Sequence, residues 1–192
     1  MSGTGGRRGR AGRGVTAAGR RSAAVDRPLR IGVIGSSAAD GTIRSAARGV
    51  GRALALARAV TVCGGLGGVM EAAADGAAAE GGLVLGFLPG GDPAAAAPGV
   101  SLPVPTGLGE ARNVLVVRAS EAVVAVAGAW GTRAEAALCM KLGIPLVGLL
   151  DDLGETFPIE RFTDPDAAAA RALELATGAR RGATDDEKKR TR

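Results

Sequence analysis

The chain has 192 residues, of which 24 are Lys or Arg and 19 are Asp or Glu, giving a formal net charge of +5. It contains no His and no Tyr, which excludes a Ser-His triad, a histidine general base, a His-based metal site and a phenolic acid. Carboxylates and arginines must therefore carry any chemistry, and we expect no metal and no cofactor.

The positive charge is concentrated at the two ends of the chain. Residues 1–30 have eight Arg and one acid, residues 179–192 have six basic and three acidic residues, and residues 31–178 have ten basic and fifteen acidic residues. Basic arms can bind nucleic acid, but no aromatic side chain interleaves these arginines to stack on bases, so we expect solvated termini and no nucleic-acid partner. The sequence predicts disorder in residues 1–28 and 179–192 and one domain over 29–178.

Residues 1–28 lack the apolar segment of a secretory signal, and no apolar run is long enough to span a membrane. Cys63 and Cys139 have no CxxC spacing and no His partner, so we interpret them as reduced, buried thiols. A cytoplasmic location without membrane contact is the default expectation.

The first half of the domain alternates apolar runs with amphipathic runs. Residues 29–35 predict a buried strand that opens into Gly35-Ser36-Ser37, and residues 41–59 predict a helix with apolar residues at spacings of three and four. A second strand at 60–63 runs into a loop at 64–68 with four glycines, and a helix follows at 69–80.

The glycine-rich loop after the second strand favours a bound phosphate, because glycines at a helix start let an anion approach free backbone amides. It is not a Walker loop, since no Lys-Ser or Lys-Thr follows, and Met70 prevents a GxGxxG match. The alternative is that these glycines serve only a tight turn and close helix packing.

In the second half, residues 83–88 predict a third strand, followed by a long Pro- and Ala-rich loop that we expect to be mobile and to rim the site. A third helix is predicted from Thr106 to about Arg118. The remaining predicted elements are strands at 121–126 and 145–150, and helices at 131–142 and 165–177, the last capped by Asp164.

The segment Ala127 to Glu135 is the turn at which we expect the ligand site to be centred. It lies between a buried strand and a helix, so its free amides and the positive end of the helix dipole suit an anion. Strands that are apolar throughout and alternate with helices predict an α/β fold, with a mainly parallel sheet covered by helices on both faces in three layers. Ligands bind beyond the carboxyl ends of such strands.

Three motifs together resemble the LOG-like (Lonely Guy) superfamily, in the order and spacing closest to its branch related to molybdenum cofactor carrier proteins. They are GGLGGVM at 64–70, GLGEARN at 107–113 and GTRAE at 131–135. The resemblance spans about residues 30–178. It implies a Rossmann-like, homo-oligomeric protein, most simply a homodimer. The superfamily's older label, lysine decarboxylase, implies pyridoxal phosphate, but nothing marks the only core lysine, Lys141, as a Schiff-base residue.

The resemblance also implies an activity, because family members cleave the N-glycosidic bond of nucleoside 5'-monophosphates to free base and ribose 5-phosphate. Their catalytic arginine and glutamate correspond to Arg112 and Glu135. Glu135 would stabilise an oxocarbenium-like ribose and orient water, while Arg112 would hold phosphate or sugar hydroxyls and keep Glu135 ionised. An ordinary Arg-Glu pair between two helices is the alternative. The residues expected to bind the ligand are Gly35, Ser36, Gly64, Gly65, Gly67, Gly68, Met70, Asn113, Gly128, Gly131 and Thr132.

Several positions depart from the family pattern. The Pro and second Gly of the family's PGGxGTxxE motif are Ala127 and Ala129, and the residues around the arginine are Gly109, Glu110 and Asn113. We expect phosphate binding to tolerate these changes, whereas Ala129 would restrict the backbone. Three functions stay open: a nucleoside monophosphate phosphoribohydrolase, a non-catalytic carrier of a phosphorylated pterin such as the molybdenum cofactor, and a nucleotide sensor.

Overall fold

The computed structural model describes residues 1, 3 and 27–190, with side chains through residue 182. Within these residues the chain forms a parallel sheet of seven strands in the order β4-β3-β2-β1-β5-β6-β7. The strands are β1 (Arg30–Gly35), β2 (Val60–Cys63), β3 (Val84–Leu88), β4 (Leu102–Pro105), β5 (Ala122–Val126), β6 (Leu146–Leu149) and β7 (Glu160–Phe162). The predicted disorder of residues 1–28 falls almost wholly outside the described residues.

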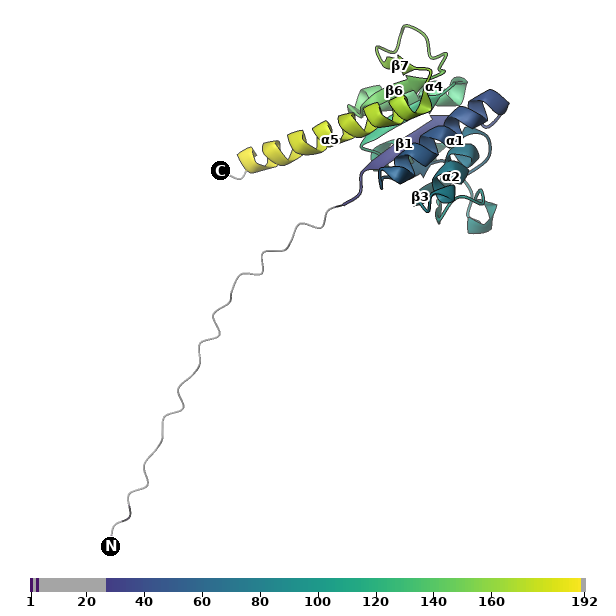
Figure 1. Cartoon of the computed structure of the whole chain (residues 1–192). Coiled ribbons are helices and arrows are strands. Elements are labelled where there is room, and N and C mark those ends of the chain that lie inside the picture. Colours follow the sequence, from purple (N-terminus) through teal and green to yellow (C-terminus); the bar gives the residue numbers. More distant parts are fainter. Residues whose placement is uncertain (2, 4–26, 191–192) are drawn as a thin grey trace.

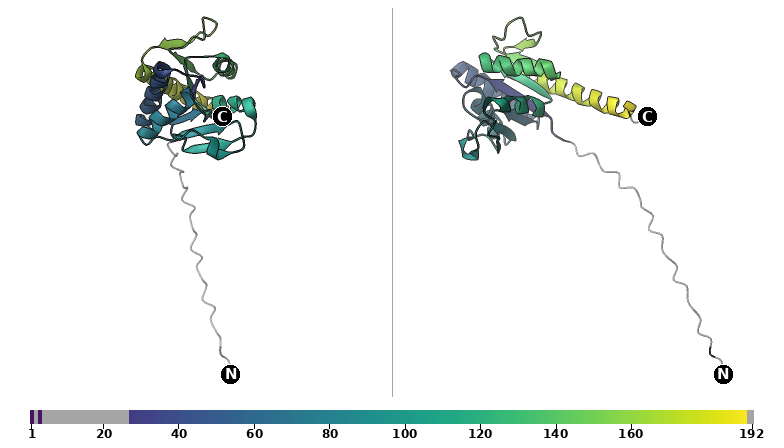
Figure 2. Two further views of the ribbon diagram at one scale, coloured as in Figure 1. Left: turned by 90° about the vertical axis from the view of Figure 1, so that its right-hand side faces the viewer. Right: turned by 180° about the vertical axis from the view of Figure 1, so that it is seen from behind.

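Helices cover both faces of the sheet, which confirms the predicted three-layer Rossmann-like fold (Figures 1 and 2). The first apolar core lies between the sheet and α1, α2 and α5, and the second lies between the sheet and α3 and α4. The helices are α1 (Gly41–Leu56), α2 (Val69–Ala79), α3 (Asn113–Ala119), α4 (Trp130–Leu142) and α5 (Pro165–Arg190), with short 3-10 helices η1 (Pro93–Ala95) and η2 (Gly109–Arg112).

Helix α1 shows how the sequence pattern becomes a packed layer. Asp40 caps it by accepting a hydrogen bond from the amide of Ile43 at 2.9 Å. Its apolar stripe is buried on the sheet, and its arginines form ion pairs with the neighbouring helices. The pairs are Arg44 with Glu71, Arg48 with Asp75 and Arg52 with Asp166. The arginine face therefore joins α1 to α2 and α5.

The sequence missed two strands and the end of one helix. Strand β4 pairs with β3 at the sheet edge, and β7 pairs with β6 at the other edge. Helix α5 continues to Arg190, where the sequence predicted an end at Thr177 and a disordered tail from residue 179. The third predicted helix is also different, because η2 forms first and the α-helix begins only at Asn113.

The long loop after β3 is held against the domain. The amide of Ala97 donates a hydrogen bond to the carbonyl of Gly65 at 2.9 Å, and Val100 packs against the core. None of residues 89–101 lines the cavity described below, so the expectation that this loop rims the site is wrong.

Both cysteines are buried free thiols, as the sequence predicted. Burial raises the pKa of Cys63 to about 11 and that of Cys139 to about 12, so both stay protonated at neutral pH. In the part of the chain that the structure describes, no helix is long and apolar enough to cross a membrane. No group of three or more His, Cys, Asp or Glu in that part could hold a metal ion.

Candidate functional site

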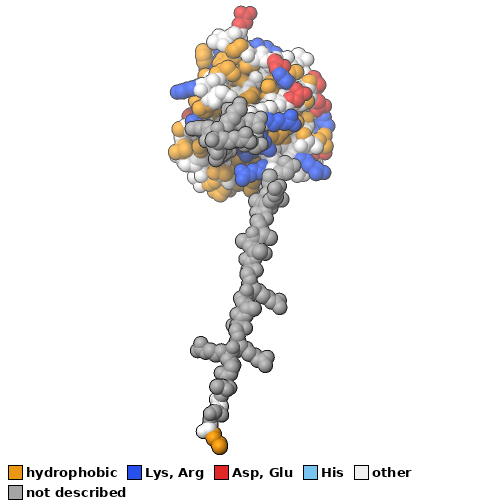
Figure 3. Space-filling view, turned by 90° about the vertical axis from the view of Figure 1, so that its left-hand side faces the viewer, with side chains coloured by type: hydrophobic (Ala, Val, Ile, Leu, Met, Phe, Trp, Pro, Cys, Tyr) orange, Lys and Arg blue, Asp and Glu red, His pale blue; other side chains and the backbone are white. Residues whose placement is uncertain are grey.

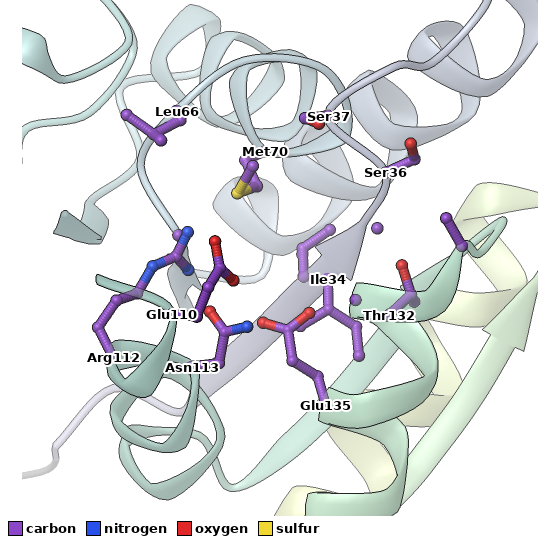
Figure 4. Close-up of a pocket in the computed structure, with 15 residues that line it drawn as sticks. Ile34, Ser36, Ser37, Leu66, Met70, Glu110, Arg112, Asn113, Thr132 and Glu135 are labelled. Atoms are coloured by element: carbon purple, nitrogen blue, oxygen red, sulfur yellow. The ribbon is translucent and has the colours of Figure 1, made fainter. Parts of the chain in front are cut away.

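The strand order reverses between β1 and β5, and a cavity of about 230 Å³ lies at this point, beyond the carboxyl ends of the strands. Four chain segments that are distant in the sequence line it (Figure 4). They contribute Val33 to Ser37; Gly64, Leu66 and Met70; Glu110, Arg112 and Asn113; and Ala129, Gly131, Thr132 and Glu135. The turns after β1, β2 and β5, which the sequence placed at the carboxyl ends of strands, meet here.

The first turn of α4 contributes free amides to the site. In α4 the first intrahelical bond runs from the amide of Arg133 to the carbonyl of Ala129, so the three preceding amides have no partner within the helix. Gly131 and Thr132, from this turn, line the cavity, as does Met70 from the first turn of α2. Neither helix has a side-chain cap. Two positive helix ends therefore border one cavity, which favours an anion.

Three cavity residues have a buried polar atom without a hydrogen-bond partner among the described residues. The atoms are Thr132 Oγ1, Arg112 Nε and Asn113 Oδ1. Thr132 and Arg112 are only 2% and 7% exposed. A buried polar atom left unpaired costs about 1–3 kcal/mol, so a polar ligand that reached these groups would recover that free energy.

Glu135 is 8% exposed, and burial is the largest influence on its carboxylate. Burial raises the pKa of Glu135 to about 7, the positive charge of Arg112 opposes the rise, and the negative charge of Glu110 adds to it. No ion pair joins Arg112 to Glu135 within residues 27–182. Arg112 lowers the pKa of Glu135, in the direction that the sequence predicted, but desolvation outweighs the arginine and the net pKa is raised.

Most of the residues that the sequence assigned to the site line the cavity. These are Gly35, Ser36, Gly64, Met70, Arg112, Asn113, Gly131, Thr132 and Glu135. Four predicted glycines do not. Gly65 packs against Leu88 and Gly86, Gly68 packs against the carbonyls of Ser36 and Ser37, Gly128 lies near Asp152 and Leu153, and Gly67 faces open space.

The structure adds six lining residues: Val33, Ile34, Ser37, Leu66, Glu110 and Ala129. Ser37 and Leu66 lie in the turns after β1 and β2 but were not assigned a role, and Ala129 was noted as a departure from the family pattern. Glu110 was noted only as a departure from the family pattern. Its placement depends on η2 and on the positive φ angles of Gly107 and Gly109, which the sequence did not predict.

The two alanine departures differ in their backbone conformation. Ala129 has φ −117° and ψ −170°, an extended conformation that any residue adopts, so the expected restriction does not arise. Ala127 has φ 51°, in the left-handed region, and its amide donates to the carbonyl of Leu149 at 3.0 Å. The strain in this turn is therefore at Ala127.

The fold and this cavity define a Rossmann-like protein of the LOG-like class, with an anion-favouring site at the switch point of its sheet. A model of the SLOG cluster4 family matches residues 28–177, and the chain belongs to that family. An uncharacterised protein from Archaeoglobus fulgidus is 40% identical over 120 residues, which cover 60% of this chain and 76% of that protein.

Solved structures agree with this assignment and confirm the predicted likeness to carrier proteins. The molybdenum cofactor binding protein of Rippkaea orientalis is 31% identical with a TM-score of 0.73, over 78% of this chain and 97% of that chain. The Moco carrier protein of Chlamydomonas reinhardtii has the same identity and TM-score, over 79% and 99%. The DNA processing protein A of Helicobacter pylori, at 21% identity and a TM-score of 0.62, shares the fold.

Proposed function

We propose that the cavity binds a nucleoside 5'-monophosphate and that Glu135 and Arg112 hydrolyse its N-glycosidic bond. The observation that carries the proposal is the buried carboxylate of Glu135, which shares one cavity with the first turns of α2 and α4. The phosphate would bind at the start of α4 beside Thr132, which would put the ribose near Glu135 and the base toward Arg112.

The chemistry follows from the charge that develops as the bond breaks. The electron pair of the C1'–N bond leaves with the base nitrogen, and the ribose gains oxocarbenium character. A carboxylate in a desolvated site stabilises a developing cation more strongly than one in water. Water adds its oxygen to C1', Glu135 accepts one proton from that water, and this proton then passes to the departing base nitrogen, so that Glu135 returns to its starting state. Free base and ribose 5-phosphate are the products.

Arg112 would donate hydrogen bonds to the ligand. Its Nε is buried and has no partner among the described residues, so the side chain is already held in the cavity with a free donor. A guanidinium suits phosphate and hydroxyl oxygens, because its donors lie in a fixed plane. It would therefore contribute to affinity as well as to turnover.

A non-catalytic carrier is the second candidate. It is favoured by the likeness to proteins described as binding or carrying the molybdenum cofactor. Near neutral pH a pKa of about 7 leaves much of Glu135 protonated, and a neutral side chain would accept an anionic ligand without acting on it. In this function a phosphorylated pterin would occupy the cavity and leave unchanged.

The deciding experiment incubates the purified protein with a panel of nucleoside 5'-monophosphates and measures free base by chromatography, with ligand-dependent melting in parallel. If the protein is a hydrolase, one of these nucleotides should release its free base. Glu135→Gln should keep binding and lower turnover by roughly two to four orders of magnitude, and Arg112→Ala should weaken both. Glu155→Gln, at an exposed position in the loop before β7, is the matched control. Tight binding without base release over hours would select the carrier.

We also propose a homo-oligomer, most simply a dimer. Trp130 is 82% exposed at the start of α4, and Met140 is exposed on the same helix. Large apolar side chains that are exposed in this way are candidate subunit contacts. Light scattering at micromolar concentration tests this, and a monomer mass would rule it out.

A further inference from the structure

Glu110 provides a second carboxylate in the cavity, away from the start of α4. Figure 4 shows Glu110 beside Arg112, with Ser36 and Thr132 on the far side and Glu135 between them. Glu110 lines the cavity but is exposed, and within residues 27–182 no hydrogen bond or ion pair involves its side chain. The proposed function gives it no role.

An ionised carboxylate accepts hydrogen bonds and donates none, so its best neutral partner offers two adjacent N–H groups. The surrounding surface suits a flat ring. Leu66 and Met70 supply apolar contact, and thioether sulfur packs favourably on aromatic rings. The guanidinium of Arg112 is planar and stacks on ring faces.

We propose that the ligand's heterocycle carries a 2-amino-lactam edge, as guanine and pterins do, and that the Glu110 carboxylate binds its ring N–H and 2-amino group side by side. This inference rests on the part of the proposed function that places the phosphate at the start of α4 and the ring near Arg112. It does not depend on hydrolysis.

The same carboxylate discriminates against adenine. Adenine presents a ring nitrogen with a lone pair where guanine presents N–H, so two acceptors would face each other. Hypoxanthine keeps the ring N–H but lacks the 2-amino group, so it forms one of the two bonds. A bidentate pair discriminates by about 5- to 150-fold, and the expected order of affinity is therefore GMP, then IMP, then AMP.

The test measures dissociation constants for GMP, IMP and AMP by calorimetry at pH 8. Wild type should prefer GMP over AMP by about 5- to 150-fold. In Glu110→Gln the ratio should fall close to one, because the amide cannot accept both bonds from guanine and can pair with adenine. Glu80→Gln, at an exposed position at the end of α2, should keep the wild-type ratio. Melting curves establish that each variant is folded.

Dihydroneopterin monophosphate, measured in the same assay, distinguishes a pterin ligand from a guanine ligand, because both rings carry the 2-amino-lactam edge. Binding of it in preference to GMP, lost in Glu110→Gln, would assign the edge to a pterin. Equal affinities for GMP and AMP, an equal loss of both in Glu110→Gln, or no binding of any of the four compounds would overturn the inference. Preferential binding of GMP without release of guanine would overturn hydrolysis and leave the inference standing.

Discussion

The guanidinium of Arg112 lies against the backbone of Gly64, so closely that a Cβ at residue 64 would overlap its terminal nitrogens and also reach the sulfur of Met70. The glycine after β2 therefore provides the space that the arginine occupies. This relationship connects the glycine-rich loop to the proposed catalytic pair through a steric contact.

Gly64→Ala should accordingly impair the site more than the fold. The overlapped atoms are the ends of flexible side chains, so we expect a stability loss of about 1–3 kcal/mol, but Arg112 must move. Affinity for the tightest nucleoside monophosphate should fall at least about tenfold, in line with the loss of a charged hydrogen bond. Gly67→Ala is the matched control, because a Cβ there meets nothing within 4 Å. Equal affinities in the two variants would show that Arg112 does not grip the ligand.

Gly68→Ala, one residue further, should act on stability. Gly68 has φ 69° and ψ −128°, a conformation that is essentially restricted to glycine. A Cβ would also collide with the carbonyl oxygens of Ser36 and Ser37. We expect a loss of at least about 1–3 kcal/mol in unfolding free energy, measured by urea denaturation. A variant as stable as Gly67→Ala would contradict this account of the turn.

The sequence predicted the elements whose pattern is local and regular. Strand β2 was placed at its observed bounds, and the prediction for β5, whose five residues are all buried, was one residue too long at its start. Strand β4 was missed because Pro103 and Pro105 interrupt it, and prolines are tolerated only because it lies at the sheet edge. Strand β7 has three residues, two of them exposed, and shows no alternation.

The candidate site could be predicted where glycines end a buried strand, because parallel strands bring such turns to one edge. The position of Glu110 could not be predicted, since it depends on a short 3-10 helix that begins at Gly109 and on the positive φ angles of Gly107 and Gly109. The raised pKa of Glu135 could not be predicted from the sequence either. Its direction depends on how completely the fold buries the carboxylate, and that outweighs the nearby Arg112.

The contacts of Arg180 indicate that the stable domain extends at least to this residue. Its guanidinium donates to both carboxylate oxygens of Glu121, at 2.8 and 2.7 Å, and to the carbonyls of Arg27 and Pro28. Arg180 lines a groove with Arg27 and Arg58 where the described chain enters β1. Several basic side chains are visible at this end of the domain (Figure 3). The sequence set the domain end at residue 178, which would remove this clamp between α5 and the start of the sheet.

A protein of residues 27–178 should therefore be less stable than one of residues 27–182, by about 1–3 kcal/mol for a charged, partly buried hydrogen-bond group. Arg180→Ala in the full chain should lose a similar amount, and Arg118→Ala, at an exposed position on α3, should change little. Ligand affinity should not change, because the clamp is at the opposite end of the strands from the cavity. Chemical denaturation measures the first effect and calorimetry the second.

Glu135 should make the unfolding free energy depend on pH. Its pKa is about 7 in the folded protein and near 4.5 when unfolded, so the folded state binds more protons between these values. Unfolding free energy must then fall as pH rises from 4.5 to 7, and the penalty is complete above pH 7. A shift of this size corresponds to roughly 3 kcal/mol at most. Burial is the main cause of the raised pKa of Glu135, the positive charge of Arg112 opposes it, and the negative charge of Glu110 adds to it.

Glu135→Gln removes the penalty because the amide never ionises. At pH 8 the variant should melt above wild type by up to about 10 °C, given roughly 2–4 °C per kcal/mol for a domain of this size. The difference should shrink as pH falls and be lowest near pH 4.5, where wild-type Glu135 is protonated in the folded state. Glu110→Gln should reduce the wild-type penalty, since it removes a negative charge that raises the pKa of Glu135. Glu155→Gln should track wild type across the range. Parallel melting profiles for Glu135→Gln and wild type would show that the carboxylate is hydrated in the cavity, and its electrostatic part in the proposed hydrolysis would then be lost.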